Sequence, residues 1–441
     1  MKLTVEKLIY GGDGLARLPA DERGRGKAVF IPFVLEGEKV EASIAEEKQG
    51  FARARAERIL EPSSLRIDPT CPYFQRCGGC HYQHSTYDHQ LAIKVEILKE
   101  NLRRLAKLEL QFPLEVHPSP PWNYRNRSRL QVHADSTFAL GYFRMSSHEL
   151  LPVEQCPISS PLINRALGVL WNLGRAGRIS ALLREIELFV DSEDAHLQIE
   201  LYLDPREEKS SRTQAGESLA KLLHDTLPEI VSVYVFPQSK RSLARGSGQT
   251  TDQPDWSTRT REFGYLTKTA NFRVSGGCFF QVNRFLIDEM VNIVTANCAG
   301  DLALDLYAGV GLFTTALTAL FRHTIAVESS QSSFADLKYN VPPNVKAVRS
   351  TVDEFLSTKG ARLRPDLVVV DPPRAGLGER VVRSLAKLAA PRLTYISCDP
   401  ATLARDLVHV LAGGYRVEQV HLVDLFPQTY HIESVVQLIH R

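Results

Sequence analysis

Residues 303–313 read Ala-Leu-Asp-Leu-Tyr-Ala-Gly-Val-Gly-Leu-Phe, an apolar strand followed by a glycine turn and the start of a helix. Glycines let a backbone pass close to a ligand, and a parallel sheet binds its ligands at the carboxyl ends of its strands. Similar apolar runs, with helical stretches between them, recur at residues 324–327, 367–370, 393–396, 417–423 and 435–439. This alternation predicts a doubly wound, Rossmann-like α/β domain with a largely parallel sheet.

The ends of these strands carry side chains that suit an adenosine-containing cofactor. Glu328 ends the second strand, at the spacing where an acid accepts hydrogen bonds from ribose hydroxyls. A dinucleotide fingerprint would have a third glycine at the position of Thr314, so the turn favours S-adenosylmethionine over NAD. Asp371 follows the third strand as either a turn cap or a ligand, and its place at a strand end favours the ligand.

Cys398 follows the fourth strand and is the candidate nucleophile, with an inert buried thiol as the alternative. Asp399 and Pro400 suit the N-cap and first residue of a helix, whose positive end favours a thiolate. Such a thiolate suits uracil methylation, because its addition to carbon 6 makes carbon 5 nucleophilic. A general base must then take the proton from carbon 5, for which Glu433 is the candidate and His431 the alternative.

Seven cysteines are an odd number for a disulfide framework, so metal ligation or catalysis explains them better. Cys71, Cys77 and Cys80 stand close together and leave a four-thiolate site one ligand short. Cys156 is the natural fourth ligand, since it precedes a proline as Cys71 does. Four thiolates suit either zinc or an iron–sulfur cluster, and the spacing leaves both open.

The composition is that of a soluble globular protein, with 44% hydrophobic and 24% charged residues. No stretch has the apolar length of a membrane span, and residues 1–7 lack the apolar core of a secretory signal. These features predict a cytoplasmic protein without a membrane partner, and a monomer needs no further assumption. The net charge of +2 does not by itself indicate a nucleic-acid binder, although local patches can still act.

The 441 residues divide by pattern into three predicted domains. Residues 1–62 alternate short strands with glycine turns, which predicts a small oligonucleotide-binding (OB-like) β-barrel. Residues 63–260 predict a mixed α+β central domain that carries the cysteine loop and ends in a linker. Residues 238–262, poor in apolar side chains, are that predicted linker or exposed loop. Residues 261–441 are the α/β domain.

Two patterns in the central region concern its packing and its partners. Residues 91–108 have the apolar spacing of an amphipathic helix. Arg125, Arg127 and Arg129 alternate along a strand, which places three guanidinium groups on one side. They are either a solvated strand face or a stripe that contacts phosphates.

Four motifs together resemble those of the RNA uracil-5 methyltransferases, and the likeness extends over essentially the whole chain. The motifs are the glycine turn at 305–311, Asp-Pro-Pro-Arg at 371–374, Ser-Cys-Asp-Pro at 397–400 and the terminal run at 426–433. Two positions depart from the common pattern. Asp399 stands where many members have Asn, and Gln428 stands where His is frequent.

The resemblance implies the roles of several residues. Gln281 is implied to join Tyr307, Glu328 and Asp371 in binding S-adenosyl-L-methionine, with Cys398 as nucleophile and Glu433 as base. It further implies a TRAM domain in residues 1–62 and a [4Fe-4S] cluster held by the four cysteines Cys71, Cys77, Cys80 and Cys156. The cluster is then expected to fix the loop rather than to transfer electrons.

The expected activity is therefore transfer of a methyl group to carbon 5 of a uridine in structured RNA. Ribosomal RNA is the expected partner and transfer RNA the alternative. An RNA cytosine-5 methyltransferase is the competing enzyme, although its cysteine follows a different motif. A non-catalytic RNA-binding protein would not need the catalytic and cofactor residues, and an iron–sulfur redox enzyme would turn over without S-adenosylmethionine.

Overall fold

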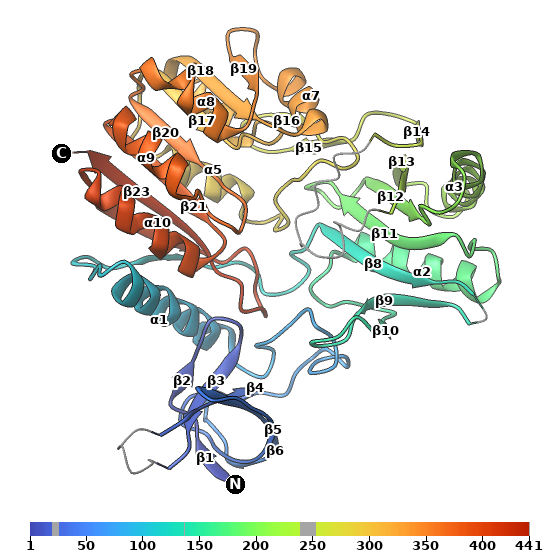
Figure 1. Ribbon diagram of the computed structural model, residues 1–441. Coiled ribbons are helices and arrows are strands. Elements are labelled where there is room, and N and C mark those ends of the chain that lie inside the picture. The colour runs from blue at the N-terminus through green and yellow to red at the C-terminus, as the bar shows by residue number, and fades with distance from the viewer. Residues whose placement is uncertain (20–25, 136, 239–252, 441) are drawn as a thin grey trace.

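The computed structural model describes residues 1–19, 26–135, 137–238 and 253–440 (Figure 1). Within these ranges the strands form sheets of six, seven and eight strands and one two-stranded ribbon, β15 (Gly264–Leu266) with β16 (Asn271–Arg273). No helix in the described part of the chain is long and apolar enough to cross a membrane.

The six-stranded sheet belongs to the N-terminal part of the chain and has the order β1-β5-β6-β4-β3-β2. Its strands are β1 (Lys2–Thr4), β2 (Lys7–Leu8), β3 (Asp13–Arg17), β4 (Ala28–Pro32), β5 (Lys39–Glu47) and β6 (Phe51–Glu61). Alternate residues of these strands point inward, and Val29, Ile31 and Val40 are fully buried among them. The strand pairing in this region follows from that alternation of apolar and polar side chains.

The seven-stranded sheet lies in the middle of the chain, in the order β10-β9-β8-β11-β12-β13-β14. Helices α2 and α3 pack against it and share its apolar core. Its elements are β8 (Arg127–His133), β9 (Ala139–Phe143), β10 (Leu150–Pro152), α2 (Pro161–Arg175), β11 (Leu183–Val190), β12 (Leu197–Leu203), α3 (Lys209–His224), β13 (Ile230–Pro237) and β14 (Trp256–Arg259). Strand β14 lies inside the predicted linker, so that prediction is wrong for its end, and residues 239–252 lie outside the described residues.

Arg127 and Arg129 of β8 serve neither of the two roles predicted for the arginine pattern. Arg127 is buried and forms ion pairs with Glu187 and Glu200 of the neighbouring strands β11 and β12. Arg129 pairs with Glu185. Charges that are buried in this way must be matched by partners, because an unpaired charge in the interior is very costly. The acids that match these arginines lie more than fifty residues away, so the local sequence does not reveal them.

The eight-stranded sheet has the order β19-β18-β17-β20-β21-β23-β22-β7, and its first five strands are parallel. Its elements are β7 (Glu115–His117), β17 (Gly300–Leu306), β18 (Phe321–Glu328), β19 (Lys346–Arg349), β20 (Leu367–Val370), β21 (Arg392–Ser397), β22 (Tyr415–Val423) and β23 (Glu433–His440). The associated helices are α5 (Ile287–Thr295), α6 (Leu312–Leu317), α7 (Gln331–Asn340), α8 (Val352–Ser357), the 3-10 helix η1 (Gly360–Arg362), α9 (Glu379–Leu388) and α10 (Pro400–Ala412). Apolar side chains of β17 and β20 pack alternately against α8, α9 and α10 on one face and α5 and α6 on the other. The doubly wound prediction is confirmed.

Helix α1 (Tyr87–Leu105) and β7 lie with the C-terminal sheet, which differs from the prediction that residues 63–260 form one central domain. Helix α1 packs against α10, and β7 pairs in parallel with the edge strand β22. A three-residue strand covers an exposed edge without leaving any periodic signal in the sequence. Leu8 of β2 and Leu35, between β4 and β5, share the same core as α1, which joins the N-terminal barrel to the C-terminal domain.

A buried ion pair joins α1 to the loop between β22 and β23. The Lys94 ammonium lies 2.6 Å from Asp424, and both side chains are almost fully buried. Lys94 also donates to the carbonyl oxygen of Phe426, at 2.9 Å. Gln90 lies one turn before Lys94 in the helix. Its side chain donates to the side chain of Gln428 and accepts the backbone N–H of Gln428. Helix α1 therefore determines the path of residues 424–428.

Replacing Lys94 with Met tests the weight of this pair. The change leaves the Asp424 carboxylate buried without its cation, so we expect the free energy of unfolding to fall by about 3–5 kcal/mol. Urea denaturation measures the loss. Lys99→Met on the exposed side of the same helix is the control and should cost less than about 1 kcal/mol. Adding Asp424→Asn to Lys94→Met should recover part of the loss, and an unchanged stability of Lys94→Met would refute the role given to the pair.

Candidate active site

The carboxyl ends of four neighbouring strands bring the predicted site residues of the C-terminal sheet to one edge. Leu306 of β17 lies beside Val327 of β18 on one side and Val370 of β20 on the other. The residues that end or directly follow the four strands are Tyr307, Glu328, Asp371 and Cys398. The edge of a doubly wound sheet is where such folds bind their ligands.

The glycine turn after β17 is held by Glu328. Gly309 and Gly311 have φ angles of 56° and 98°, and Tyr307 also lies in the left-handed region at 66°. One carboxylate oxygen of Glu328 accepts the Gly309 N–H at 2.9 Å, and the other accepts the Ser330 N–H at 2.6 Å. Each oxygen keeps a lone pair for a ligand, so Glu328 both shapes the turn and faces what binds there.

Cys398 and Glu433 come together through the pairing of β21 with β23. These strands are antiparallel, and Ser397 lies opposite Ser434. The next position along each strand places Cys398 beside Glu433, where Cys398 is half-buried and Glu433 is buried. As expected, Asp399 caps helix α10, accepting the N–H groups of Ala401 and Thr402 at 3.0 and 2.9 Å.

The surroundings of the Cys398 thiol oppose its ionisation. Burial, together with the nearby Glu433 and Asp371 carboxyls, raises the pKa of Cys398 to about 12, although Arg374 opposes the shift. That the helix N-terminus favours a thiolate stays a prediction, and burial with the nearby acids acts against it. The sequence places Arg374 in a motif, but it does not reveal that this cation is the one that counters the acids around the thiol.

Buried carboxyl groups crowd the same edge and raise each other's pKa values. Burial and the neighbouring Asp305 raise the pKa of Asp371 to about 7. Burial, assisted by Glu328, raises the pKa of Asp305 to about 6. Burial and the Asp371 charge raise the pKa of Glu433 well above its usual value. A cationic ligand would relieve this repulsion, so the crevice suits a positively charged molecule.

Asp305 is a site residue that the sequence reasoning missed. One of its oxygens accepts the Thr314 hydroxyl. The other is buried and has no hydrogen-bond partner among the described residues. A buried acceptor without a partner in a ligand crevice is a natural contact for a ligand N–H group. Thr314, which stands in place of a third glycine, explains why the acid is held there.

Aromatic side chains from three parts of the chain pack together beside the backbone of Cys398. The Tyr10 hydroxyl, from the turn between β2 and β3, donates to the carbonyl oxygen of Cys398 at 3.3 Å. Its ring packs edge-on against Tyr430, with 5.5 Å between centroids. Tyr430 in turn contacts His81 and His431. Burial lowers the pKa of His431 to about 3, so this imidazole is neutral and a weak base.

The four predicted metal ligands converge on one cavity. Cys71, Cys77, Cys80 and Cys156 all line a cavity of about 300 Å³ and are all free thiols. Burial raises the pKa of Cys77 to about 11. The half-exposed ring of Phe279 also lines this cavity, whereas Gln281 is buried and its carbonyl oxygen accepts the Asn126 amide at 3.0 Å. The described contacts of Gln281 are with this neighbouring segment and not with Cys398.

Comparison with known proteins agrees with this arrangement. A protein of Aquifex aeolicus described as an uncharacterized RNA methyltransferase is 32% identical over 99% of this chain and 98% of its own length. A protein of Streptomyces avermitilis with the same description is 31% identical over 99% and 97%.

The fold also matches a solved structure. The crystal structure of the Pyrococcus abyssi tRNA (uracil-54, C5)-methyltransferase, in complex with S-adenosyl-L-homocysteine, superposes with a TM-score of 0.74 over the full length of both chains, at 22% identity. Residues 1–56 match the TRAM domain, and residues 86–441 match the model of the tRNA (uracil-5-)-methyltransferase family. The chain therefore belongs to the tRNA (uracil-5-)-methyltransferase family.

Proposed function

We propose that this protein methylates carbon 5 of a uridine in structured RNA, using S-adenosylmethionine and a covalent adduct between Cys398 and carbon 6. The observation that carries the proposal is the strand register that places Cys398 beside Glu433 at the carboxyl edge of the sheet. A nucleophile and a base at that edge, next to an acid-lined cofactor crevice, are the two groups that uracil methylation requires.

The proposed reaction assigns one bond change to each residue. The Cys398 sulfur adds to carbon 6 of the uracil, and the electron pair of the C5–C6 double bond makes carbon 5 nucleophilic. S-adenosylmethionine would supply an electrophilic methyl group when bound, which carbon 5 takes, with S-adenosyl-L-homocysteine as the leaving group. Glu433 then removes the carbon 5 proton, the double bond re-forms and the carbon–sulfur bond breaks. Elimination returns the sulfur to Cys398.

The thiol must lose its proton before it attacks, and the acids of the site explain how binding assists this loss. A cofactor that carries a sulfonium charge lowers the pKa of every acid near it. Cys398, Glu433 and Asp371 all have raised pKa values, so all three shift toward their charged forms when the cation enters. We propose Gln281, Tyr307, Glu328 and Asp371 as the cofactor contacts, and we add Asp305.

For the cysteine cavity we propose a [4Fe-4S] cluster held by the four thiols. Zinc bound at about 2.3 Å to four sulfurs would require sulfur–sulfur distances of about 3.8 Å. Among the described residues the cysteine sulfurs form no group of three within 4.8 Å of one another, and they line a cavity of about 300 Å³. This spacing suits a larger inorganic group than a single ion. Thiolates bound to iron would stiffen the loop that carries His81, which contacts Tyr430.

The RNA partner is proposed from the TRAM match and the family. Ribosomal RNA remains our prediction. Transfer RNA, which is named in the family and in the Pyrococcus abyssi enzyme, is the alternative. Mapping 5-methyluridine in RNA from cells with and without the protein decides between them.

Cys398→Ala should abolish methylation, because carbon 5 of uracil is then never activated. The dissociation constant for S-adenosylmethionine, measured by calorimetry, should change less than threefold. Cys298→Ala is the matched control, since this cysteine lies after α5 with its thiol bonded to the Thr295 carbonyl, and it should keep its turnover. Methyl transfer by Cys398→Ala would exclude the covalent mechanism.

Glu433→Gln should trap the methylated RNA on the protein, because elimination then lacks its base. The adduct is measured as a protein–RNA band on a denaturing gel, and the double variant with Cys398→Ala should show none. Glu418→Gln, at an acid of β22 paired with Arg392, should behave as the parent protein. If Glu433→Gln turns over normally, another group takes the proton.

Asp371→Asn tests the acid cluster through pH. An acid whose folded-state pKa is raised from 3.8 to about 7 stabilises the fold below about pH 4, and this contribution is lost as pH rises through 7. The cofactor-free parent should therefore lose thermal stability between pH 5 and 8. Asp371→Asn should lose less, melting a few degrees higher than the parent at pH 8 while binding S-adenosylmethionine at least about tenfold more weakly. Identical melting profiles for the two proteins would contradict the raised pKa.

A further inference from the structure

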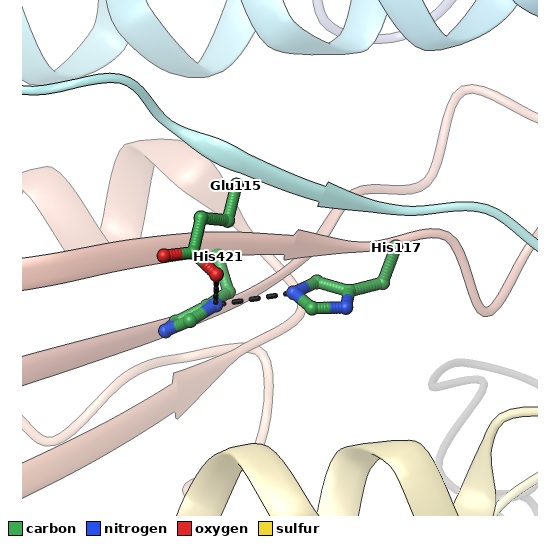
Figure 2. Close-up of side chains that lie close together, drawn as sticks. All are labelled: Glu115, His117 and His421. Carbon is green, nitrogen blue, oxygen red and sulfur yellow. Dashed lines mark hydrogen bonds and ion pairs between the residues drawn. The ribbon is translucent and has the colours of Figure 1, made fainter.

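A second cluster of metal-binding side chains lies on β7 and β22, which follow β21 and β23 in the order of the sheet. Strand β7 contributes Glu115 and His117, and β22 contributes His421, which lies opposite Glu115 in the parallel pairing. Figure 2 shows the carboxylate and the two imidazoles turned toward one another between the strands. The mechanism proposed above uses none of these residues.

The distances between their ligand atoms match a single small metal ion. His117 Nε2 lies 3.1 Å from His421 Nδ1, and His421 Nδ1 lies 3.4 Å from an oxygen of Glu115. One ligand atom from each of the three residues falls within 4.8 Å of the other two. A tetrahedral zinc site with bonds of about 2.0–2.1 Å has edges of about 3.3–3.4 Å. The side chains therefore need to move little to surround an ion.

A fourth residue holds one imidazole in the orientation and tautomer that a metal needs. Glu289, in helix α5, lies 2.9 Å from His117 Nδ1. A carboxylate accepts a proton there, so Nδ1 carries the hydrogen and the Nε2 lone pair faces the cluster. Metal-bound histidines are commonly held by an acid in this way. His421 is buried, whereas Glu115 and Glu289 are about half-exposed, which leaves room for a water molecule as a further ligand.

We propose that Glu115, His117 and His421 form a binding site for Zn²⁺, with Glu289 supporting His117. Binding through His421 Nδ1 requires the hydrogen of that neutral imidazole to move from Nδ1 to Nε2, and the metal then takes the place of the hydrogen between the two facing rings. The site ties β7 to β22, and the carbonyl oxygen of His117 accepts the N–H of Asp424 at 3.0 Å. An ion here would therefore brace the start of the loop that helix α1 holds from the other side.

Equilibrium dialysis of the full-length protein against ZnCl₂, followed by elemental analysis, tests the site. Because the cysteine cavity can itself take zinc, the readout is the difference between variants. At a free zinc concentration near the dissociation constant of the parent, where its site is half filled, we expect the parent to hold up to about half a zinc equivalent more than Glu115→Gln or His421→Gln. His133→Gln, at an exposed histidine of β8, is the control and should match the parent.

Two further measurements make the result decisive. Zn²⁺ at a hundredfold excess over its dissociation constant should raise the melting temperature of the parent by a few degrees, and that of Glu115→Gln less. Glu115 is half-exposed, so its variant folds even if His421→Gln does not. The Co²⁺ spectrum of the parent minus that of Glu115→Gln should show the visible bands of nitrogen and oxygen ligands without a thiolate charge-transfer band. Equal zinc content in parent, Glu115→Gln and His421→Gln would overturn the proposal.

Discussion

The buried ion pair of Lys94 and Asp424 is the constraint on which the site depends. Two charges that leave water together must stay together, so helix α1 and the loop after β22 have one relative position. That loop leads through Gln428, at a left-handed φ of 68°, into the aromatic group and then into Glu433. The position of Glu433, the proposed base, therefore depends on a helix that lies more than three hundred residues earlier in the chain. Gln428, which departs from the common family pattern, pairs with Gln90 of the same helix.

The acids of the crevice explain why the pKa values of the site are raised and how a cationic cofactor would change them. Asp305, Asp371 and Glu433 repel one another when charged, and burial makes each charge costly. Burial and this repulsion therefore shift Asp371, Glu433 and Cys398 toward their protonated forms. A cationic cofactor would shift this balance toward the charged forms, including the thiolate of Cys398. Without a cationic ligand, the raised pKa keeps the Cys398 side chain in its less reactive thiol form.

Much of this could be predicted from the sequence, because the signals are local. A strand, a glycine turn and a helix start reveal the doubly wound domain, and Asp399 with Pro400 reveals the start of α10. What could not be predicted depends on contacts between distant segments. No local pattern reveals which acids pair with the buried Arg127 or that β7 joins the C-terminal sheet. Nor does one reveal that an oxygen of Asp305 has no hydrogen-bond partner among the described residues. The raised pKa of the Cys398 thiol also lacks a local signal, because a helix end is visible in the sequence and desolvation is not.

The hydrogen bond from Tyr10 to the Cys398 carbonyl gives the N-terminal barrel a structural role in the site, in addition to the RNA binding expected of a TRAM domain. Deleting the first 62 residues would remove the region that matches the TRAM domain. It would also remove Tyr10, whose hydroxyl bonds to the Cys398 carbonyl and whose ring packs against Tyr430. Loss of activity in the truncated protein would therefore not distinguish lost RNA binding from a disturbed site around Cys398. Domain-swapped chimaeras face the same difficulty, since a borrowed barrel must bring its own tyrosine to the same carbonyl.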